Sequence, residues 1–158
     1  MIHLRPALPL DTDSLWALRT LAVRISCATH YSAEQIAAWS ASPVPAAYAG
    51  MIAAGGGIVA MHGDALAGYA MLDIEKQEVD AVFVDPGRGG LGIGKRLLAA
   101  LEDVARERGI SSLRLSASLN AEPFYRAAGF VALREDVYVH PSGIKLACVA
   151  MAKVVTPT

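Results

Sequence analysis

The sequence lacks the features that mark secreted, membrane-spanning, metal-binding or nucleic-acid-binding proteins. It has only two cysteines and no basic N-terminal region followed by a long apolar one, so we expect reduced thiols in a cytoplasmic protein. No apolar run reaches the ~18 residues of a membrane span. The net charge of −1 argues against a nucleic-acid partner. The four histidines are scattered without ligand spacing, so no metal is expected.

Apolar residues, in contrast, are abundant. They make up 54% of the chain, against 18% for charged residues, which is typical of a globular protein rather than a disordered one. A chain of 158 residues is long enough for one domain with a substantial core. We therefore predict a single domain over residues 1–155, followed by a short tail at 156–158.

Hydrophobic periodicity and turn residues predict an α/β fold of alternating strands and helices. We expect the C-terminal strand, over residues 144–153, at a sheet edge that allows a homodimer to form by pairing with a second copy. The predicted strands cover residues 2–5, 58–62, 67–74, 78–84, 112–117, 130–139 and 144–153, and the predicted helices cover 15–25, 33–40, 46–54, 93–108 and 120–128.

The most informative segment joins the strand over 78–84 to the helix that follows it. It reads Gly87-Arg88-Gly89-Gly90-Leu91-Gly92-Ile93-Gly94-Lys95. Glycines between a strand end and a helix start leave backbone N–H groups pointing out of a turn, beside the positive end of the helix dipole. This arrangement predicts a site for a phosphate or pyrophosphate group.

Three kinds of phosphate loop compete for this segment. A dinucleotide fingerprint fits the spacing of three glycines, but the acidic residue it requires would fall inside the helix pattern, near Asp103. A nucleotide P-loop matches from Gly89 to Lys95, but its eighth position is Arg96, which has no hydroxyl for magnesium. The third kind binds the pyrophosphate of coenzyme A, and the loop alone does not decide between them.

Two motifs together resemble those of the GNAT N-acetyltransferase superfamily, which uses acetyl-CoA. The first runs Val82-Phe83-Val84-Asp85-Pro86 and continues as Gly90-Leu91-Gly92-Ile93-Gly94-Lys95-Arg96-Leu97-Leu98. The second, Ala121-Glu122-Pro123-Phe124-Tyr125-Arg126-Ala127-Ala128-Gly129-Phe130, is similar to the family's downstream Ala-x-x-Phe-Tyr-x-x-x-Gly-Phe. The order of elements fits the family over nearly the whole chain.

The resemblance implies a mixed, mostly antiparallel central sheet flanked by helices and splayed between the strands 78–84 and 112–117. It also implies that an acetyl group moves from acetyl-CoA to a primary amine by direct attack, without a metal. The acceptor would be a small-molecule amine or a peptide or protein amine. A non-catalytic acetyl-CoA-binding or regulatory module stays as the alternative.

The same resemblance assigns roles to individual residues. Tyr125 would protonate the departing thiolate as a general acid. Ser118 stands where the family often has asparagine, with Asn120 two residues later, and both are expected near the pantetheine arm. The backbone of the strand end and of the loop would hold the rest of the cofactor, through Val82, Phe83, Val84, Gly90, Leu91, Gly92, Ile93, Gly94 and Lys95.

One departure from the family concerns the charge in the loop. The family usually has arginine or glutamine three residues before the first motif glycine, where this chain has Gly89, with Arg88 one place early. We therefore expect the loop to hold its pyrophosphate mainly by backbone amides.

Glu78 and Asp80 are the candidates for the base that takes the proton from the amine. They lie two residues apart on a predicted strand, so both side chains should point to one face. The alternative is that they are solvated charges at a strand start.

Tyr31, Gln35 and Trp39 recur every four residues and would share one face of a helix. In the resembled family the first two helices help to wall the acceptor site, so these side chains are predicted to contact the acceptor. The alternative is an aromatic stripe packed into the core. Arg19 and Arg24, on the first predicted helix, are expected to be surface charges.

Overall fold

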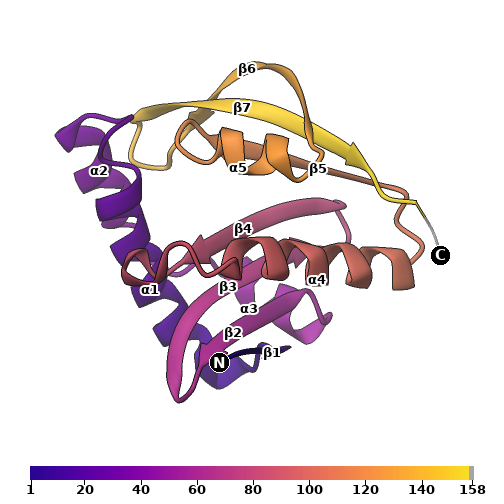
Figure 1. Cartoon of the computed structure of the whole chain (residues 1–158). Helices are drawn as coiled ribbons and strands as arrows, with labels where there is room; N and C mark the ends of the chain where they lie inside the picture. Colours follow the sequence, from indigo (N-terminus) through magenta and orange to yellow (C-terminus); the bar gives the residue numbers. More distant parts are fainter. Residues whose placement is uncertain (157–158) are drawn as a thin grey trace.

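The computed structural model describes residues 1–156 and contains a seven-stranded sheet in the order β1-β2-β3-β4-β5-β7-β6 (Figure 1). The last two residues of the predicted tail, 157–158, lie outside the described residues. The strands are β1 Ile2–Pro6, β2 Gly57–His62, β3 Ala65–Asp73, β4 Glu78–Val84, β5 Ser112–Ser118, β6 Val131–Val139 and β7 Lys145–Val154. The helices are α1 Thr12–Ser26, α2 Ala33–Ser40, α3 Ala47–Ala53, α4 Ile93–Glu107 and α5 Glu122–Ala127, with short 3₁₀ turns η1 Pro9–Asp11 and η2 Pro86–Arg88.

The sheet opens between β4 and β5, as the sequence predicts. These two strands run parallel and share one register pair within the described residues, Glu78 with Arg114, whereas the other neighbouring strands pair antiparallel. Figure 1 shows the consequence: β1 to β4 form the lower half of the molecule, and β5, β7 and β6 form the upper half. The mostly antiparallel, splayed sheet is therefore confirmed, and the cleft it creates lies toward the C-terminal end of β4.

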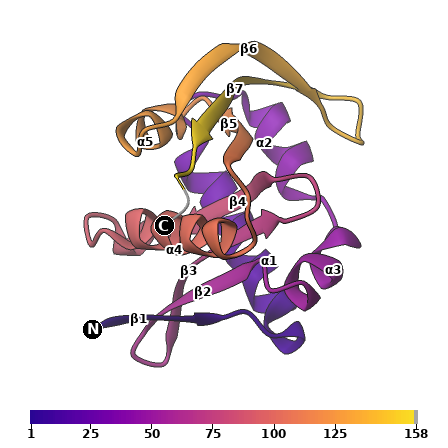
Figure 2. The same ribbon diagram turned by 90° about the vertical axis from the view of Figure 1, so that its right-hand side faces the viewer.

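Helices cover both faces of the lower half, because each carries an apolar stripe. The stripe of α4, which includes Leu97, Leu98 and Leu101, is buried against β2, β3 and β4, while α1 and α3 pack on the opposite face (Figure 2). Gly68 on β3 allows the start of α4 to approach the sheet: a Cβ there would lie 2.8 Å from the Phe83 carbonyl oxygen and 3.2 Å from Ile93 Cγ2. This close approach fixes the position of the glycine loop that precedes α4.

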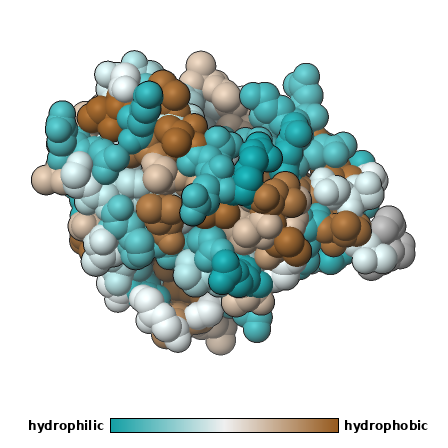
Figure 3. Space-filling model, turned by 90° about the horizontal axis from the view of Figure 1, so that it is seen from above, coloured by the Kyte–Doolittle hydropathy of each residue, from teal (hydrophilic) through white to brown (hydrophobic). Residues whose placement is uncertain are grey.

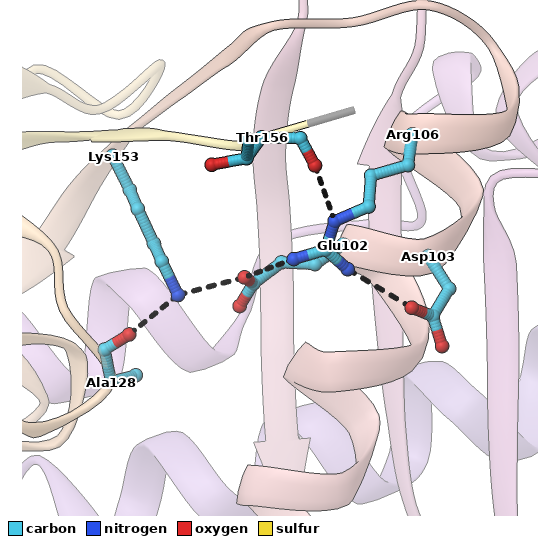
Figure 4. Close-up of polar contacts among 6 residues, drawn as sticks. All are labelled: Glu102, Asp103, Arg106, Ala128, Lys153 and Thr156. Carbon is cyan, nitrogen blue, oxygen red and sulfur yellow. Dashed lines mark hydrogen bonds and ion pairs between the residues drawn. The ribbon is translucent and has the colours of Figure 1, made fainter. Parts of the chain in front are cut away.

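A polar cluster attaches α4 to the upper half of the sheet (Figure 4). Glu102, on α4, is only 6% exposed, and the Nζ atom of Lys153 from β7 lies 2.7 Å from its Oε1. The same Nζ donates a hydrogen bond to the carbonyl of Ala128, at 2.7 Å. Arg106 extends the cluster to Asp103 and to the carbonyl of Thr156. These contacts join α4 to β7 and to the end of α5, and so connect the two halves of the molecule.

The structure corrects the prediction about the sheet edge. The strand predicted over residues 144–153 corresponds to β7, which lies between β5 and β6, so β6 is the edge strand on this side. Every residue of β6 is exposed, including Val131, Leu133 and Val139. Figure 3 looks down on this side of the molecule and shows apolar patches interrupted by polar side chains.

Candidate active site

The splay between β4 and β5 contains two cavities that share a wall. The first has a volume of about 420 Å³ and the second about 340 Å³. The shared wall consists of Val82, Phe83, Ser118 and Ala121, from β4, β5 and the turn that leads into α5. A ligand in the first cavity is therefore separated from one in the second only by the splayed strand ends.

The first cavity brings together every residue that the sequence predicts to bind the cofactor. Its lining includes the end of β4, residues 88–95 of the glycine loop and the start of α4, and residues from the end of β5 and the turn that follows it. These residues are Val82, Phe83, Val84, Gly90, Leu91, Gly92, Ile93, Gly94, Lys95, Ser118 and Asn120. The sequence missed Ser26 and Cys27, at the end of α1, and Phe124 of α5, which also line this cavity.

The glycine loop has the backbone conformation that an anion site requires. Gly90 and Gly92 have φ angles of +80° and +73°, in the left-handed region that glycine enters without strain. Gly92 is the N-cap of α4, and it supplies no side chain to the N–H groups of the first turn. That turn contains no acidic residue, so its free N–H groups and the helix dipole favour a negatively charged ligand.

The Arg88 guanidinium is held by the protein rather than directed freely into the loop. Its Nη1 lies 3.0 Å from His62 Nδ1, and its Nε lies 3.4 Å from Asp85 Oδ2. Asp85 in turn accepts a hydrogen bond from the Gly87 N–H, at 2.9 Å. Arg88 therefore supports the shape of η2, although it also lines the first cavity.

Replacing Arg88 with alanine should weaken acetyl-CoA binding only modestly, by less than about 10-fold in Kd, because the pyrophosphate is expected on the backbone amides. Isothermal titration calorimetry measures this directly. Arg134→Ala, an exposed arginine on β6, is the matched control and should leave Kd unchanged. A loss of more than ~2 kcal/mol for Arg88→Ala would show that Arg88 is a direct charged ligand.

Tyr125 lines the second cavity and is also part of the core. Its side chain is 7% exposed, and its ring contacts Phe124 and Phe130 edge-on, with centroids 5.1 and 5.7 Å apart. Burial and the negative charge of Asp80 raise the pKa of Tyr125 above its usual value. The phenol therefore stays protonated at neutral pH, which is the state that a proton donor needs.

Both candidate bases line the second cavity, although β4 is irregular where they lie. Met71 pairs with Ala81 and Leu72 pairs with Val79, so Asp80 is the extra residue of a β-bulge. Although the Asp80 side chain is open to solvent, desolvation by the protein around it, reinforced by Glu78 and Asp73, raises its pKa to about 6. Despite the bulge, the side chain of Asp80 lines the second cavity. A carboxylate with this pKa is basic enough to take a proton near neutral pH.

Two of the three predicted acceptor contacts line the second cavity. Tyr31 and Trp39 do so, with ring centroids 5.3 Å apart. Tyr31 lies before α2 rather than on it, because Ser32 caps that helix. Its hydroxyl donates to the Ala147 carbonyl and accepts from the Leu119 N–H, which ties the segment between α1 and α2 to both β7 and the β5–α5 turn.

Gln35 is not among the residues that line the cavity, contrary to the prediction. Its Oε1 accepts from the Ser32 N–H at 2.8 Å, and Ser32 Oγ accepts from the Gln35 N–H at 3.1 Å, which makes a capping box. Its Nε2 donates to the Lys145 carbonyl. The four-residue spacing put Tyr31 on one helix with Gln35 and Trp39, whereas α2 begins only at Ala33.

The structure also corrects the prediction that Arg19 is a surface charge, because its side chain is only 4% exposed and lines the second cavity. A signal was present in the sequence. Leu15, Leu18 and Ala22 form the buried stripe of α1, and Arg19 occupies the intervening position of that stripe. The sequence likewise missed Trp16, Tyr48 and Tyr138 as lining residues.

Two absences apply to residues 1–156. No group of three or more histidine, cysteine, aspartate or glutamate side chains in this range is placed to hold a metal ion. None of the helices described there has the length and apolar character needed to cross a membrane.

Comparison with known proteins agrees with this geometry. The acetyltransferase (GNAT) domain family matches residues 27–153, and no curated protein matches the chain. A GCN5-related N-acetyltransferase from Rhodopseudomonas palustris is a similar solved structure, with 29% identity, a TM-score of 0.82, and coverage of 96% of this chain and 94% of that one. A ribosomal-protein-alanine N-acetyltransferase from Brucella melitensis has 25% identity, a TM-score of 0.68, and coverage of 96% and 99%.

A third similar structure, the PaiA N-acetyltransferase from Thermoplasma acidophilum in complex with coenzyme A, shares the fold at 21% identity, with a TM-score of 0.76 and coverage of 98% and 99%. The family match spans most of the chain and includes the glycine loop and Tyr125. The chain therefore belongs to the GNAT acetyltransferase family, whose members are acyltransferases that use acetyl-CoA.

Proposed function

We propose that this protein transfers the acetyl group of acetyl-CoA to a primary amine by direct attack. Acetyl-CoA lies along the first cavity, with its pyrophosphate on the loop from Gly90 to Lys95, and the amine enters through the second. The observation that carries the proposal is the wall between the two cavities. Val82 and Phe83, where the thioester is predicted to lie, line the second cavity together with Asp80 and Tyr125, which supports these roles.

The residues around this wall match the needs of the reaction. The attacking amine must be neutral, and Asp80 accepts its proton, directly or through a water. Beyond Glu78, the edge of β4 that faces β5 has no strand partner among the described residues. Its free backbone N–H groups are suited to stabilise the oxyanion that forms as the nitrogen bonds to the carbonyl carbon. The carbon–sulfur bond then breaks, and Tyr125 gives its proton to the CoA thiolate.

Asp80→Asn should lower kcat/KM and should abolish the fall in kcat/KM that the wild-type enzyme shows at acidic pH as Asp80 becomes protonated. With a pKa of about 6, Asp80 is a base above that pH and is inactive as one below it. The ratio of wild-type to Asp80→Asn activity should therefore rise about 10-fold from pH 5 to pH 7 and then level off at roughly 10² or more. The ratio cancels the ionisation of the amine itself. A ratio that is flat across this range would exclude Asp80, and Glu78→Gln would then be measured in the same way.

The function is tested by following CoA thiol release with a panel of primary amines, with mass spectrometry of the product. Transfer predicts thiol release in equal amount to acetylated amine. The alternative, a non-catalytic acetyl-CoA-binding module, predicts binding of acetyl-CoA without amine-dependent release. That result across small amines, amino acids and peptides would overturn the proposed catalysis while leaving the binding site intact.

A further inference from the structure

The second cavity contains a buried cation that the acetyl-transfer step does not use. Arg19 lies in the middle of α1, between Leu18 and Ala22 on the buried stripe, and its side chain is 4% exposed. Placing an arginine at this position costs free energy, because burial removes its charge from water. The same burial lowers the pKa of Arg19 from its usual value.

The contacts of Arg19 leave part of its hydrogen-bonding capacity unused. Nη2 donates to the Trp39 carbonyl at 2.8 Å, and the guanidinium carbon lies 4.2 Å from the centroid of the Trp16 ring. Nη1 is buried without a hydrogen-bond partner among the described residues. No carboxylate of residues 1–156 lies within 4.0 Å of this guanidinium. The charge is therefore oriented by neutral groups and has no counter-charge in this part of the chain.

A relay of hydrogen bonds that begins at the Trp39 carbonyl helps to fix the orientation of Arg19. The Trp39 carbonyl also accepts from Ser42 Oγ at 2.8 Å, and Ser42 Oγ lies 2.6 Å from His140 Nε2. The Ser142 N–H donates to His140 Nδ1 at 3.1 Å, which leaves Nε2 as the nitrogen that carries the proton. The turn between β6 and β7 thus helps to hold Arg19 in one position before any acceptor arrives.

The lining of the same cavity also includes acidic residues. They are Glu78 and Asp80 of β4, and Tyr48, which also lines the cavity, is influenced by the charges of both Asp80 and Arg19. Burial, with a smaller contribution from Asp80, raises the pKa of Tyr48 to about 12, while the hydrogen bond with Tyr69 and the charge of Arg19 oppose that rise. The cavity volume of about 340 Å³ is at the lower end of the range for small-molecule sites. A cavity of this size that contains both a buried cation and carboxylates suits a small acceptor that carries an amine and an anionic group.

We propose that the acceptor is an amino-acid-like molecule, with a carboxylate near its primary amine, and that Arg19 binds this carboxylate. The proposal rests on the proposed acetyl transfer. The planar fork of a guanidinium matches a carboxylate, and a buried, pre-oriented pair of this kind is stronger than one in water. The amine is then directed toward Asp80 and the thioester. A polyamine, which carries only positive charge, is disfavoured by the same cation.

The wild-type enzyme gives the first test, since it needs no variant. Thiol release is measured for a set of free α-amino acids and for the α-amides of the same amino acids. The free acid should show a kcat/KM roughly 10- to 100-fold higher than its amide, as a charge-assisted pair to arginine predicts. The amine of an amide is less basic and is more often neutral at pH 7, so amine ionisation would favour the amide. Equal or better turnover of the amides would overturn the proposal.

Substitutions then connect this preference to Arg19. Arg19→Met should remove most of the preference for the free acid, mainly by raising KM for the acceptor, and should leave KM for acetyl-CoA unchanged. Arg19→Lys should retain part of the preference. Arg24→Met, an exposed position of the same helix, is the matched control and should behave as wild type. A preference for the free acid that survives in Arg19→Met would contradict the assignment.

Binding without turnover separates this inference from the proposed function. Thermal shifts of the wild-type protein with CoA are measured on adding amino acids and their amides. Free amino acids should raise the midpoint of thermal unfolding more than their amides do, both in the wild-type protein and in Arg24→Met. In Arg19→Met the two kinds of ligand should give equal shifts. Thiol release from amides or polyamines alone, without acid-selective shifts, would overturn the role of Arg19 and leave acetyl transfer standing. Acid-selective shifts without any thiol release would overturn acetyl transfer and keep the Arg19 site.

Discussion

Tyr125→Phe is expected to lower kcat by roughly 10²- to 10⁴-fold, because the CoA thiolate would leave without a proton donor. The KM for acetyl-CoA should change little, since phenylalanine keeps the edge-on ring contacts with Phe124 and Phe130. Thiol-release kinetics at saturating amine and acetyl-CoA measure the effect. The raised pKa of Tyr125 also predicts that wild-type kcat is not lost at moderately alkaline pH.

Tyr69→Phe provides the matched control for this substitution. Tyr69 is fully buried, its hydroxyl lies 2.8 Å from that of Tyr48, and it is not among the residues that line either cavity. Deleting this hydroxyl should cost about 1 kcal/mol of stability and leave kcat near the wild-type value. If Tyr125→Phe were as active as Tyr69→Phe, Tyr125 would be a packing residue and the proton would come from elsewhere.

Gly92→Val is expected to raise the Kd for acetyl-CoA by roughly 10- to 100-fold. A β-branched residue does not tolerate the φ angle of +73°, at a cost of about 1–2 kcal/mol. No atom lies within 4 Å of the added Cβ, so the strain would be relieved by turning the peptide units rather than by moving neighbours. That rotation redirects the N–H groups at the start of α4, and calorimetric titration with acetyl-CoA measures the loss.

Gly63→Val tests whether this effect is specific to the loop. Gly63 lies in the turn between β2 and β3 with a φ angle of +62° and equally open surroundings. It should lose a similar amount of stability in a denaturant titration while binding acetyl-CoA as wild type does. An equal loss of acetyl-CoA affinity in both variants would mean that the loop does not hold the pyrophosphate.

Local features of the sequence were sufficient to predict the elements and the glycine loop. The apolar stripe of α4 has a helical period, and the glycines before it mark a strand-to-helix turn without any information from elsewhere in the chain. The same is true of the motif around Tyr125. Each of these signals lies within a short segment, so no tertiary contact is needed to interpret it.

The features that were missed depend on contacts between distant segments. The orientation of Arg19 depends on Trp39, Ser42 and the β6–β7 turn, which only the fold brings together. The bulge at Asp80 is a property of its pairing with β3.

The position of β7 inside the sheet was also missed, although the sequence contained a signal for it. Arg134, Glu135 and Asp136 are consecutive charges in β6, which is typical of an edge strand, whereas β7 is continuously apolar from Leu146 to Ala152.

The central claim is that the glycine loop and the splay between β4 and β5 form an acetyl-CoA site. Calorimetric titration of the wild-type protein with acetyl-CoA tests it most directly. The structure predicts saturable binding of one acetyl-CoA per chain, weakened in Gly92→Val and preserved in Gly63→Val. The absence of binding at millimolar acetyl-CoA would contradict the claim.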